Sequence, residues 1–231
     1  MIDFPYQIIG FDLDGTLLDT HRDLGAAVNH ALALAGRPPV PPELVRDLIG
    51  GGARRMLERA LQAGGPVADQ QFDRLFLGLL DYYEAHIAIH TRLLPGGKAM
   101  LADLSARGVR MAVVTNKLER LAVRLIDVLG LSDYFFAIIG GDTLGPGRSK
   151  PAPDLLDEMV ARGGGGCAAY VGDSTLDTLA ARAAGLPCIA VSFGFNDRPA
   201  AELGADAVID HFDQLVPALT RLAKADHTIC R

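Results

Sequence analysis

Short β-like runs alternate with helical patterns along this 231-residue chain, and this alternation restricts the possible folds more than any other feature. The predicted strands are rich in Ile, Val or Phe and cover residues 7–14, 110–116, 135–142, 168–173, 186–193 and 207–210. The helical patterns between them end on glycine and cover residues 97–108, 118–130, 154–163 and 177–185. Strands that alternate with helices of this length predict βαβ units, and therefore an α/β fold with a Rossmann-like, doubly wound parallel sheet.

The alternation breaks between the first two predicted strands, where most of the sequence has a helical pattern. Apolar residues recur at helical spacing in three stripes: Leu24, Val28, Ala31 and Ala35; Met56, Leu57, Ala60 and Leu61; Phe72, Leu75, Phe76, Leu79, Tyr83 and Ile87. A structureless loop of this length is uncommon in a compact domain. We therefore expect an inserted α-helical cap domain at residues 19–88 and a catalytic core formed by residues 1–18 and 89–231.

Acidic residues end the predicted strands, at the edge where parallel sheets bind ligands. Asp12 and Asp14 are two residues apart, so on an extended strand their side chains leave one face about 6.6 Å apart. Asp173 ends another predicted strand, and Asp177 follows it. These carboxylates repel one another without a cation, and an oxygen-only ligand set suits Mg²⁺. The sequence therefore predicts a Mg²⁺ site formed by Asp12, Asp14, Asp173 and Asp177.

A complementary set of residues at other strand ends suits a phosphoryl group. It comprises a hydroxyl, an amide and an ammonium, from Thr115, Asn116 and Lys150. Phosphoryl transfer spreads negative charge over the equatorial oxygens, which Mg²⁺ and Lys150 would neutralise. A carboxylate nucleophile divides the displacement into two steps through an aspartyl phosphate, and a second acid can serve as general acid and base. Asp12 and Asp14 suit these two roles.

Four segments, taken together and in order, resemble the motifs of haloacid dehalogenase-like phosphatases. They are 11–17 (FDLDGTL), 114–116 (VTN), 150–151 (KP) and 172–177 (GDSTLD). The resemblance implies that Asp12 is the nucleophile and Asp14 the acid/base. It also implies that the Asp12 carboxylate, the Asp14 main-chain carbonyl and Asp173 bind Mg²⁺, while Asp177 organises its waters. The phosphate would be held by Thr115, Asn116 and Lys150.

Further segments resemble the bacterial phosphoglycolate phosphatase family. They are 19–20 (DT), 24–29 (LGAAVN), 49–57 (IGGGARRML), 140–144 (GGDTL) and 191–195 (VSFGF). This resemblance implies hydrolysis of 2-phosphoglycolate to glycolate and phosphate. Leu94, where an aromatic residue is usual, and the glycine run 163–166 depart from the family pattern without touching a catalytic position.

Two other classes of function remain open at this point. The same scaffold could carry another small-metabolite phosphatase, a pyrophosphatase or a phosphosugar mutase. A phospho-accepting switch domain also combines acids, a Thr and a Lys at the end of a doubly wound sheet. The helical insert and the acid/base Asp14 argue against a switch, because an acid beside an acyl phosphate promotes its turnover.

Several residues have a structural interpretation as well as a functional one. Asp177 completes a capping-box pattern with Ser174. Arg54, after a glycine run, could bring a guanidinium to a substrate carboxylate, or lie in solvent. Lys117 is expected at the surface. His86, with a second histidine four residues later, has metal-pair spacing but flanks an apolar stripe and lacks the Glu of the zinc-protease motif, so a packing role is favoured.

Composition and charge narrow the partners to small molecules. The chain has 22 Lys+Arg against 28 Asp+Glu, a formal net charge of −6, and no basic run long enough to track nucleic acid. No apolar segment approaches the roughly 18 residues of a membrane span. The three cysteines have unrelated spacings that suggest no disulfide framework. We expect a cytoplasmic phosphomonoester phosphatase without nucleic-acid or membrane partners, as a monomer or homodimer.

Overall fold

The computed structural model describes residues 4–62 and 64–225. Its strands are β1 (Ile8–Phe11), β2 (Leu18–Asp19), β3 (Arg92–Leu93), β4 (Arg110–Val114), β5 (Phe135–Ile139), β6 (Ala168–Gly172), β7 (Cys188–Val191) and β8 (Ala207–Ile209). Its α-helices are α1 (His21–Leu34), α2 (Val45–Leu48), α3 (Ala53–Gln62), α4 (Asp69–Ala85), α5 (Gly97–Ala106), α6 (Glu119–Val128), α7 (Asp154–Arg162), α8 (Thr175–Ala183) and α9 (Leu215–Ala225). Short 3₁₀ turns are η1 (Pro42–Leu44), η2 (Ser132–Tyr134), η3 (Ala200–Glu202) and η4 (Phe212–Gln214).

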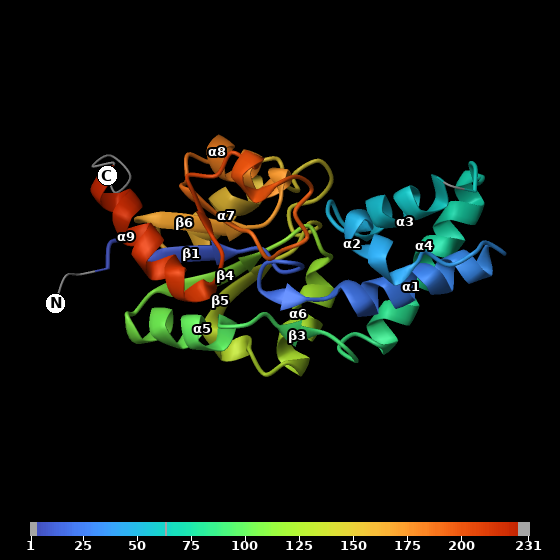
Figure 1. Cartoon of the computed structure of the whole chain (residues 1–231), viewed down its shortest axis with the longest axis horizontal. Helices are drawn as coiled ribbons and strands as arrows, with labels where there is room; N and C mark the ends of the chain where they lie inside the picture. Colours follow the sequence, from blue (N-terminus) through green and yellow to red (C-terminus); the bar gives the residue numbers. More distant parts are fainter. Residues whose placement is uncertain (1–3, 63, 226–231) are drawn as a thin grey trace.

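Six strands form one parallel sheet in the order β5-β4-β1-β6-β7-β8 (Figure 1). All four residues of β1 are buried, as expected for a central strand covered on both faces. This arrangement confirms the predicted Rossmann-like α/β fold. Because β1 lies between β4 and β6, the carboxyl ends of these three strands are neighbours, and the residues that follow them meet at one edge of the sheet.

Helices cover both faces of the sheet, and the strands alternate between them. Ile9 and Phe11 pack in the same cluster as apolar side chains of α5, α6 and α9. Ile8, on the opposite face of β1, packs with residues of α7 and α8. Burial of one such large aliphatic or aromatic side chain contributes about 1.5–3 kcal/mol to folding. The two apolar clusters therefore fix the strand faces and, through them, the direction in which the strand ends point.

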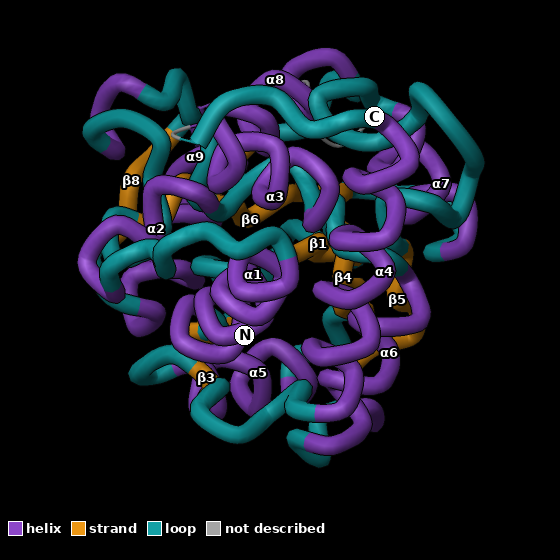
Figure 2. Tube along the Cα trace, turned by 90° about the vertical axis from the view of Figure 1, so that its right-hand side faces the viewer, coloured by secondary structure: helices purple, strands orange, loops and turns teal. Residues whose placement is uncertain are grey.

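The helices α1 to α4 form a separate helical unit between β1 and β4 (Figure 1). Within it α1 packs mainly on α4 and also on α3. Figure 2 looks onto this unit, with α1, α3 and α4 in front of the strands. We call α1 to α4 the cap. The predicted boundaries at residues 19 and 88 stay a prediction, although all four helices lie between them.

Two short linkers join the cap to the core and lie side by side. They contain β2 and β3, which pair antiparallel through Leu18 with Leu93 and Asp19 with Arg92. Asp23, buried in the first turn of α1, accepts hydrogen bonds from the backbone N–H groups of the returning linker at His90 and Thr91, and from the Thr91 hydroxyl at 2.7 Å. One buried carboxylate therefore ties the start of α1 to the returning linker.

Cys188 is a buried free cysteine, whereas Cys167, just before β6, is disulfide-bonded. The cysteine spacing did not predict this bond. None of the described helices is both long enough and apolar enough to cross a bilayer.

Candidate active site

The carboxyl edge of the sheet and the cap enclose a cavity that the predicted site residues line. Asp12 follows β1, Thr115 and Asn116 follow β4, Asp173 follows β6, and Lys150 lies in the loop between β5 and α7. All five border this cavity, together with residues of α3 and α4 from the cap. The topology therefore brings together the groups that the sequence analysis placed at separate strand ends.

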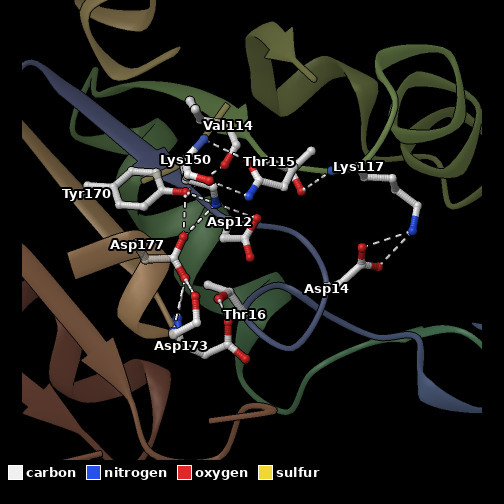
Figure 3. Close-up of polar contacts among 12 residues, drawn as sticks. Asp12, Asp14, Thr16, Val114, Thr115, Lys117, Lys150, Tyr170, Asp173 and Asp177 are labelled. Carbon is white, nitrogen blue, oxygen red and sulfur yellow. Dashed lines mark hydrogen bonds and ion pairs between the residues drawn. The ribbon is translucent and has the colours of Figure 1, made fainter. Parts of the chain in front are cut away.

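Lys150 is the buried cation at the centre of this cluster (Figure 3). Its Nζ lies 2.9 Å from Asp12 Oδ1 and donates hydrogen bonds to Asp177 Oδ1 at 2.5 Å and to the Tyr170 hydroxyl at 2.8 Å. Burial alone would lower the pKa of Lys150, but the two carboxylates outweigh it and raise that pKa. Lys150 is therefore a fixed ammonium beside the predicted nucleophile.

Three carboxylates form the group that could hold a metal. One oxygen from each of Asp12, Asp173 and Asp177 lies within 4.8 Å of the others, and this is the one such group found among the described residues. Burial raises the pKa of Asp12 to about 6, against the opposing effect of Lys150. Burial, followed by the charges of Asp177 and Asp12, raises the pKa of Asp173 well above its ordinary value.

These observations fit a divalent cation. Asp12 Oδ1 is buried and, although Lys150 lies nearby, receives no hydrogen bond of acceptable geometry from the described residues. A buried oxygen of this kind lacks a partner, which a bound cation would supply. A positive ion would also stabilise the ionised form of carboxylates that lie close together. Hard oxygen ligands without His or Cys favour Mg²⁺ over a transition metal.

Asp177 has the structural role that its sequence pattern indicated, and a second contact besides. Its Oδ2 accepts hydrogen bonds from the Ser174 backbone at 3.0 Å and the Ser174 hydroxyl at 2.6 Å, which completes a capping box at the start of α8. Its Oδ1 accepts from Lys150. Asp177 thus couples the N-terminus of α8 to the buried ammonium.

Asn116 is engaged with the Lys150 backbone in a reciprocal pair of hydrogen bonds. Its Nδ2 donates to the Lys150 carbonyl, and its Oδ1 accepts from the Lys150 N–H, both at 2.9 Å. This amide therefore fastens the loop that carries Lys150 to the end of β4. Thr115 is also buried, and its hydroxyl accepts a hydrogen bond from the Lys117 N–H at 3.3 Å.

The structure corrects two expectations about Asp14 and Lys117. Strand β1 ends at Phe11 and the chain turns at once, so Asp14 does not share an extended strand face with Asp12. Lys117 is only 7% exposed, so the surface location expected for it is wrong. Its Nζ lies 2.9 Å from both Asp14 oxygens (Figure 3). It also lies 4.6 Å from the centre of the Tyr83 ring of α4.

Arg54 does not border the cavity. Its guanidinium lies over Phe72 and Phe76, 4.9 Å from each ring centre, and pairs with Asp73 at 3.2 Å. The neighbouring Arg55 does border the cavity, beside the glycine turn 50–52. At Gly52, whose φ is +88°, a Cβ would lie 3.0 Å from the Asn116 carbonyl oxygen, so the cap turn contacts the core directly.

Three residues that support the site were not assigned roles from the sequence. The Tyr170 hydroxyl donates to the Val114 carbonyl at 2.6 Å and accepts from Lys150. Thr16 donates to Asp173 at 3.1 Å, and the Phe195 N–H donates to the same carboxylate at 2.6 Å. Thr16 stands inside the first motif, whereas nothing local marks Tyr170, which sits in an apolar strand pattern.

Comparison with known proteins finds related sequences that match most of this chain. A family model described as haloacid dehalogenase-like hydrolase matches residues 9–191. Phosphoglycolate phosphatase of Caulobacter vibrioides is 44% identical over 207 residues, which cover 88% of this chain and 86% of the relative. Phosphoglycolate phosphatase of Agrobacterium fabrum is 44% identical over 214 residues, covering 90% of each chain.

Solved structures agree in overall shape. A predicted phosphoglycolate phosphatase from Haemophilus somnus superposes with a TM-score of 0.86 at 30% identity, covering 92% of this chain and 97% of that one. CbbY from Rhodobacter sphaeroides, solved in complex with phosphate, superposes with a TM-score of 0.79 at 26% identity, covering 93% of this chain and 99% of that one. The similarity therefore includes both the core and the cap.

Proposed function

The chain belongs to the haloacid dehalogenase-like hydrolase family, and from this premise we propose that it is a Mg²⁺-dependent phosphatase that hydrolyses 2-phosphoglycolate to glycolate and phosphate. The observation that carries the proposal is the placement of Asp12, a partly buried carboxylate at the end of β1 beside the Lys150 ammonium, in the cavity under the cap. The names of the 44% identical relatives support the substrate.

The metal site that we propose uses the carboxylates of Asp12 and Asp173 and the main-chain carbonyl of Asp14, with Asp177 behind them. When bound, Mg²⁺ supplies positive charge to the phosphoryl oxygens. Thr16 and the Phe195 N–H hold the Asp173 carboxylate in place. Lys150 and Thr115 border the same cavity and would contact the phosphate oxygens that the metal does not.

The reaction proceeds in two displacements at phosphorus. A carboxylate oxygen of Asp12 forms a bond to phosphorus while the bond to the ester oxygen breaks, and protonated Asp14 gives its proton to the leaving alkoxide. Water then attacks the aspartyl phosphate, and Asp14 takes the proton from that water. The P–O bond to Asp12 breaks, which releases phosphate and restores both carboxyl groups.

A positively charged side chain at the cavity favours an acidic substrate. Arg55 borders the cavity and makes no hydrogen bond or ion pair with any described residue, so its guanidinium is free to attract an anionic substrate into the cavity. We propose this attraction for Arg55, because Arg54, the arginine considered from the sequence, does not border the cavity. The cytoplasmic location and the choice between monomer and homodimer stay predictions.

The test is phosphate release by the purified protein over a panel of small phosphomonoesters, pyrophosphate and sugar phosphates, with and without Mg²⁺. We expect the highest kcat/KM for 2-phosphoglycolate and no turnover after Mg²⁺ is removed with a chelator. If kcat/KM were highest for a sugar phosphate or for pyrophosphate, that compound would replace 2-phosphoglycolate as the proposed substrate. A long-lived phosphoaspartate without sustained phosphate release would indicate a switch domain.

Asp12→Asn supplies the matched control for that panel. The amide is nearly isosteric but a very poor nucleophile, so we expect a loss of turnover of at least about 10³-fold with an unchanged thermal midpoint. Asp127→Asn makes the same chemical change at an exposed position on α6 and should retain full activity. Substantial turnover in Asp12→Asn would refute the role of Asp12.

A further inference from the structure

Asp14, the proposed acid/base, is held by a buried ammonium in this structure. Both of its oxygens lie 2.9 Å from Lys117 Nζ, and the Lys117 side chain is almost fully enclosed. In Figure 3 this pair lies apart from the group formed by Asp12, Lys150 and Asp177. The carboxylate that must exchange protons with the leaving group is therefore turned toward Lys117.

A side chain of the cap packs against this ion pair. The Tyr83 ring of α4 lies 4.6 Å from Lys117 Nζ, and Tyr83 is itself buried. A buried ammonium whose anionic partner leaves is strongly destabilised, because the isolated charge has neither water nor a counter-ion. Asp14 can turn to the phosphate at low cost only if another anion takes its place beside Lys117.

The other cations around the cavity are less suited to such an exchange. Lys150 is already surrounded by Asp12, Asp177 and the Tyr170 hydroxyl. Arg59 donates to the carbonyls of Leu48 and Ile49, at 3.2 and 3.4 Å. Arg55 is exposed and holds no anion that could be exchanged. Lys117 is thus the cavity cation whose one carboxylate partner among the described residues is the proposed acid/base, Asp14.

We propose that Lys117 is a positioning residue that exchanges Asp14 for the carboxylate of the substrate. This inference rests on the proposed phosphatase function and deepens it. A phosphomonoester with a nearby carboxylate places that group beside Lys117, which releases Asp14 toward the ester oxygen. A phosphomonoester without a second anion leaves Asp14 on Lys117. Selection for acidic substrates is then expressed in kcat as well as in KM.

The experiment compares two substrates of similar size, 2-phosphoglycolate and ethyl phosphate, which differ in the carboxylate. The variants are Lys117→Met, which removes the charge, and Lys117→Arg, which keeps it. Lys98→Met, at an exposed position on α5 away from the cavity, is the matched control. Lys117→Gln serves in place of Lys117→Met if that variant fails to fold by circular dichroism.

In the wild-type protein we expect a much larger kcat for 2-phosphoglycolate than for ethyl phosphate. In Lys117→Met the ratio of these two kcat values should fall at least about tenfold, because kcat for 2-phosphoglycolate falls while kcat for ethyl phosphate rises. Lys117→Arg should recover part of the ratio, and Lys98→Met should keep all of it.

Two results would overturn the inference. An unchanged kcat ratio in the neutral variant would mean that Lys117 supports the fold alone. A change confined to KM would mean that Lys117 binds the carboxylate without controlling Asp14. If the wild-type protein released phosphate from neither substrate, the proposed function itself would fail, which is a distinguishable outcome.

Discussion

At the scale of single residues, the site depends on hydrogen bonds that hold reactive groups rather than on those groups alone. Lys150 is the clearest example, because its ammonium has three N–H donors and three oxygens around it. Tyr170 supplies one of these oxygens and is anchored in turn on the Val114 carbonyl. The hydroxyl of Tyr170 therefore sets where the positive charge lies relative to Asp12.

Tyr170→Phe tests this arrangement. Removal of the hydroxyl leaves the Val114 carbonyl and one Lys150 donor without a partner inside the protein, which costs about 1–3 kcal/mol of unfolding free energy. We expect kcat for 2-phosphoglycolate to fall about tenfold with little change in KM, as measured by steady-state phosphate release. Tyr134→Phe, in η2, is the matched control. A loss of stability with unchanged kcat would show that Tyr170 only supports packing.

At the scale of elements, cap and core are joined through two short paired strands and one buried carboxylate. The strands β2 and β3 contribute two residues each. Asp23 accepts four hydrogen bonds from the returning linker, from His90 and Thr91. The position of α1 against this linker therefore depends on one carboxylate.

Asp23→Asn should destabilise the junction. The new amide group places N–H donors opposite the backbone N–H groups of the returning linker, which thereby lose an acceptor. An unsatisfied buried donor costs about 1–3 kcal/mol. We expect a lower urea midpoint with an unchanged m-value. The exposed Asp127→Asn variant should match the wild-type protein. An unaltered midpoint in Asp23→Asn would mean that the linker pairing holds without this carboxylate.

Strand and helix alternation was predictable from sequence because it depends on local patterns, and the edge at which Asp12, Asp173 and Lys150 meet follows from parallel pairing. The environment of Lys117 was not predictable in this way. Its burial depends on contact with Tyr83, a cap residue that is distant from Lys117 in the sequence. The same holds for the contrast between Arg54 and Arg55, since a one-residue difference on a helix rotates a side chain by about 100°.

At the scale of the whole molecule, the core gathers several carboxylates at one edge of the sheet. The stability of the folded protein therefore depends on pH. Burial raises the pKa of Asp12 from 3.8 to about 6, and raises the pKa of Asp173 as well. Between the unfolded and folded pKa values the metal-free folded protein binds more protons than the unfolded chain. The contribution of Asp12 to stability is therefore present below about pH 4 and is lost as pH rises through 6, and the contribution of Asp173 is lost in the same direction.

Mg²⁺ should reverse this loss. It competes with protons for the same oxygens, so it should raise the thermal midpoint more at pH 7.5 than at pH 5. At 100 times its Kd, a ligand that binds only the folded state adds about 2.7 kcal/mol. Thermal melts with Mg²⁺ or a chelator at both pH values measure this, and Asp173→Asn should abolish most of the Mg²⁺ effect. Equal midpoint shifts at the two pH values would contradict the assignment.

The paired linkers have a consequence for how such a protein can diversify. Because β2 and β3 leave and rejoin the core as neighbours, the chain enters and leaves the insert at one place. The parallel pairing of β1 with β4 does not pass through it. A different insert can replace it over evolutionary time while the strand register and the carboxylates stay the same. The residues that the insert places over the cavity can then change while the strand ends that carry the carboxylates do not.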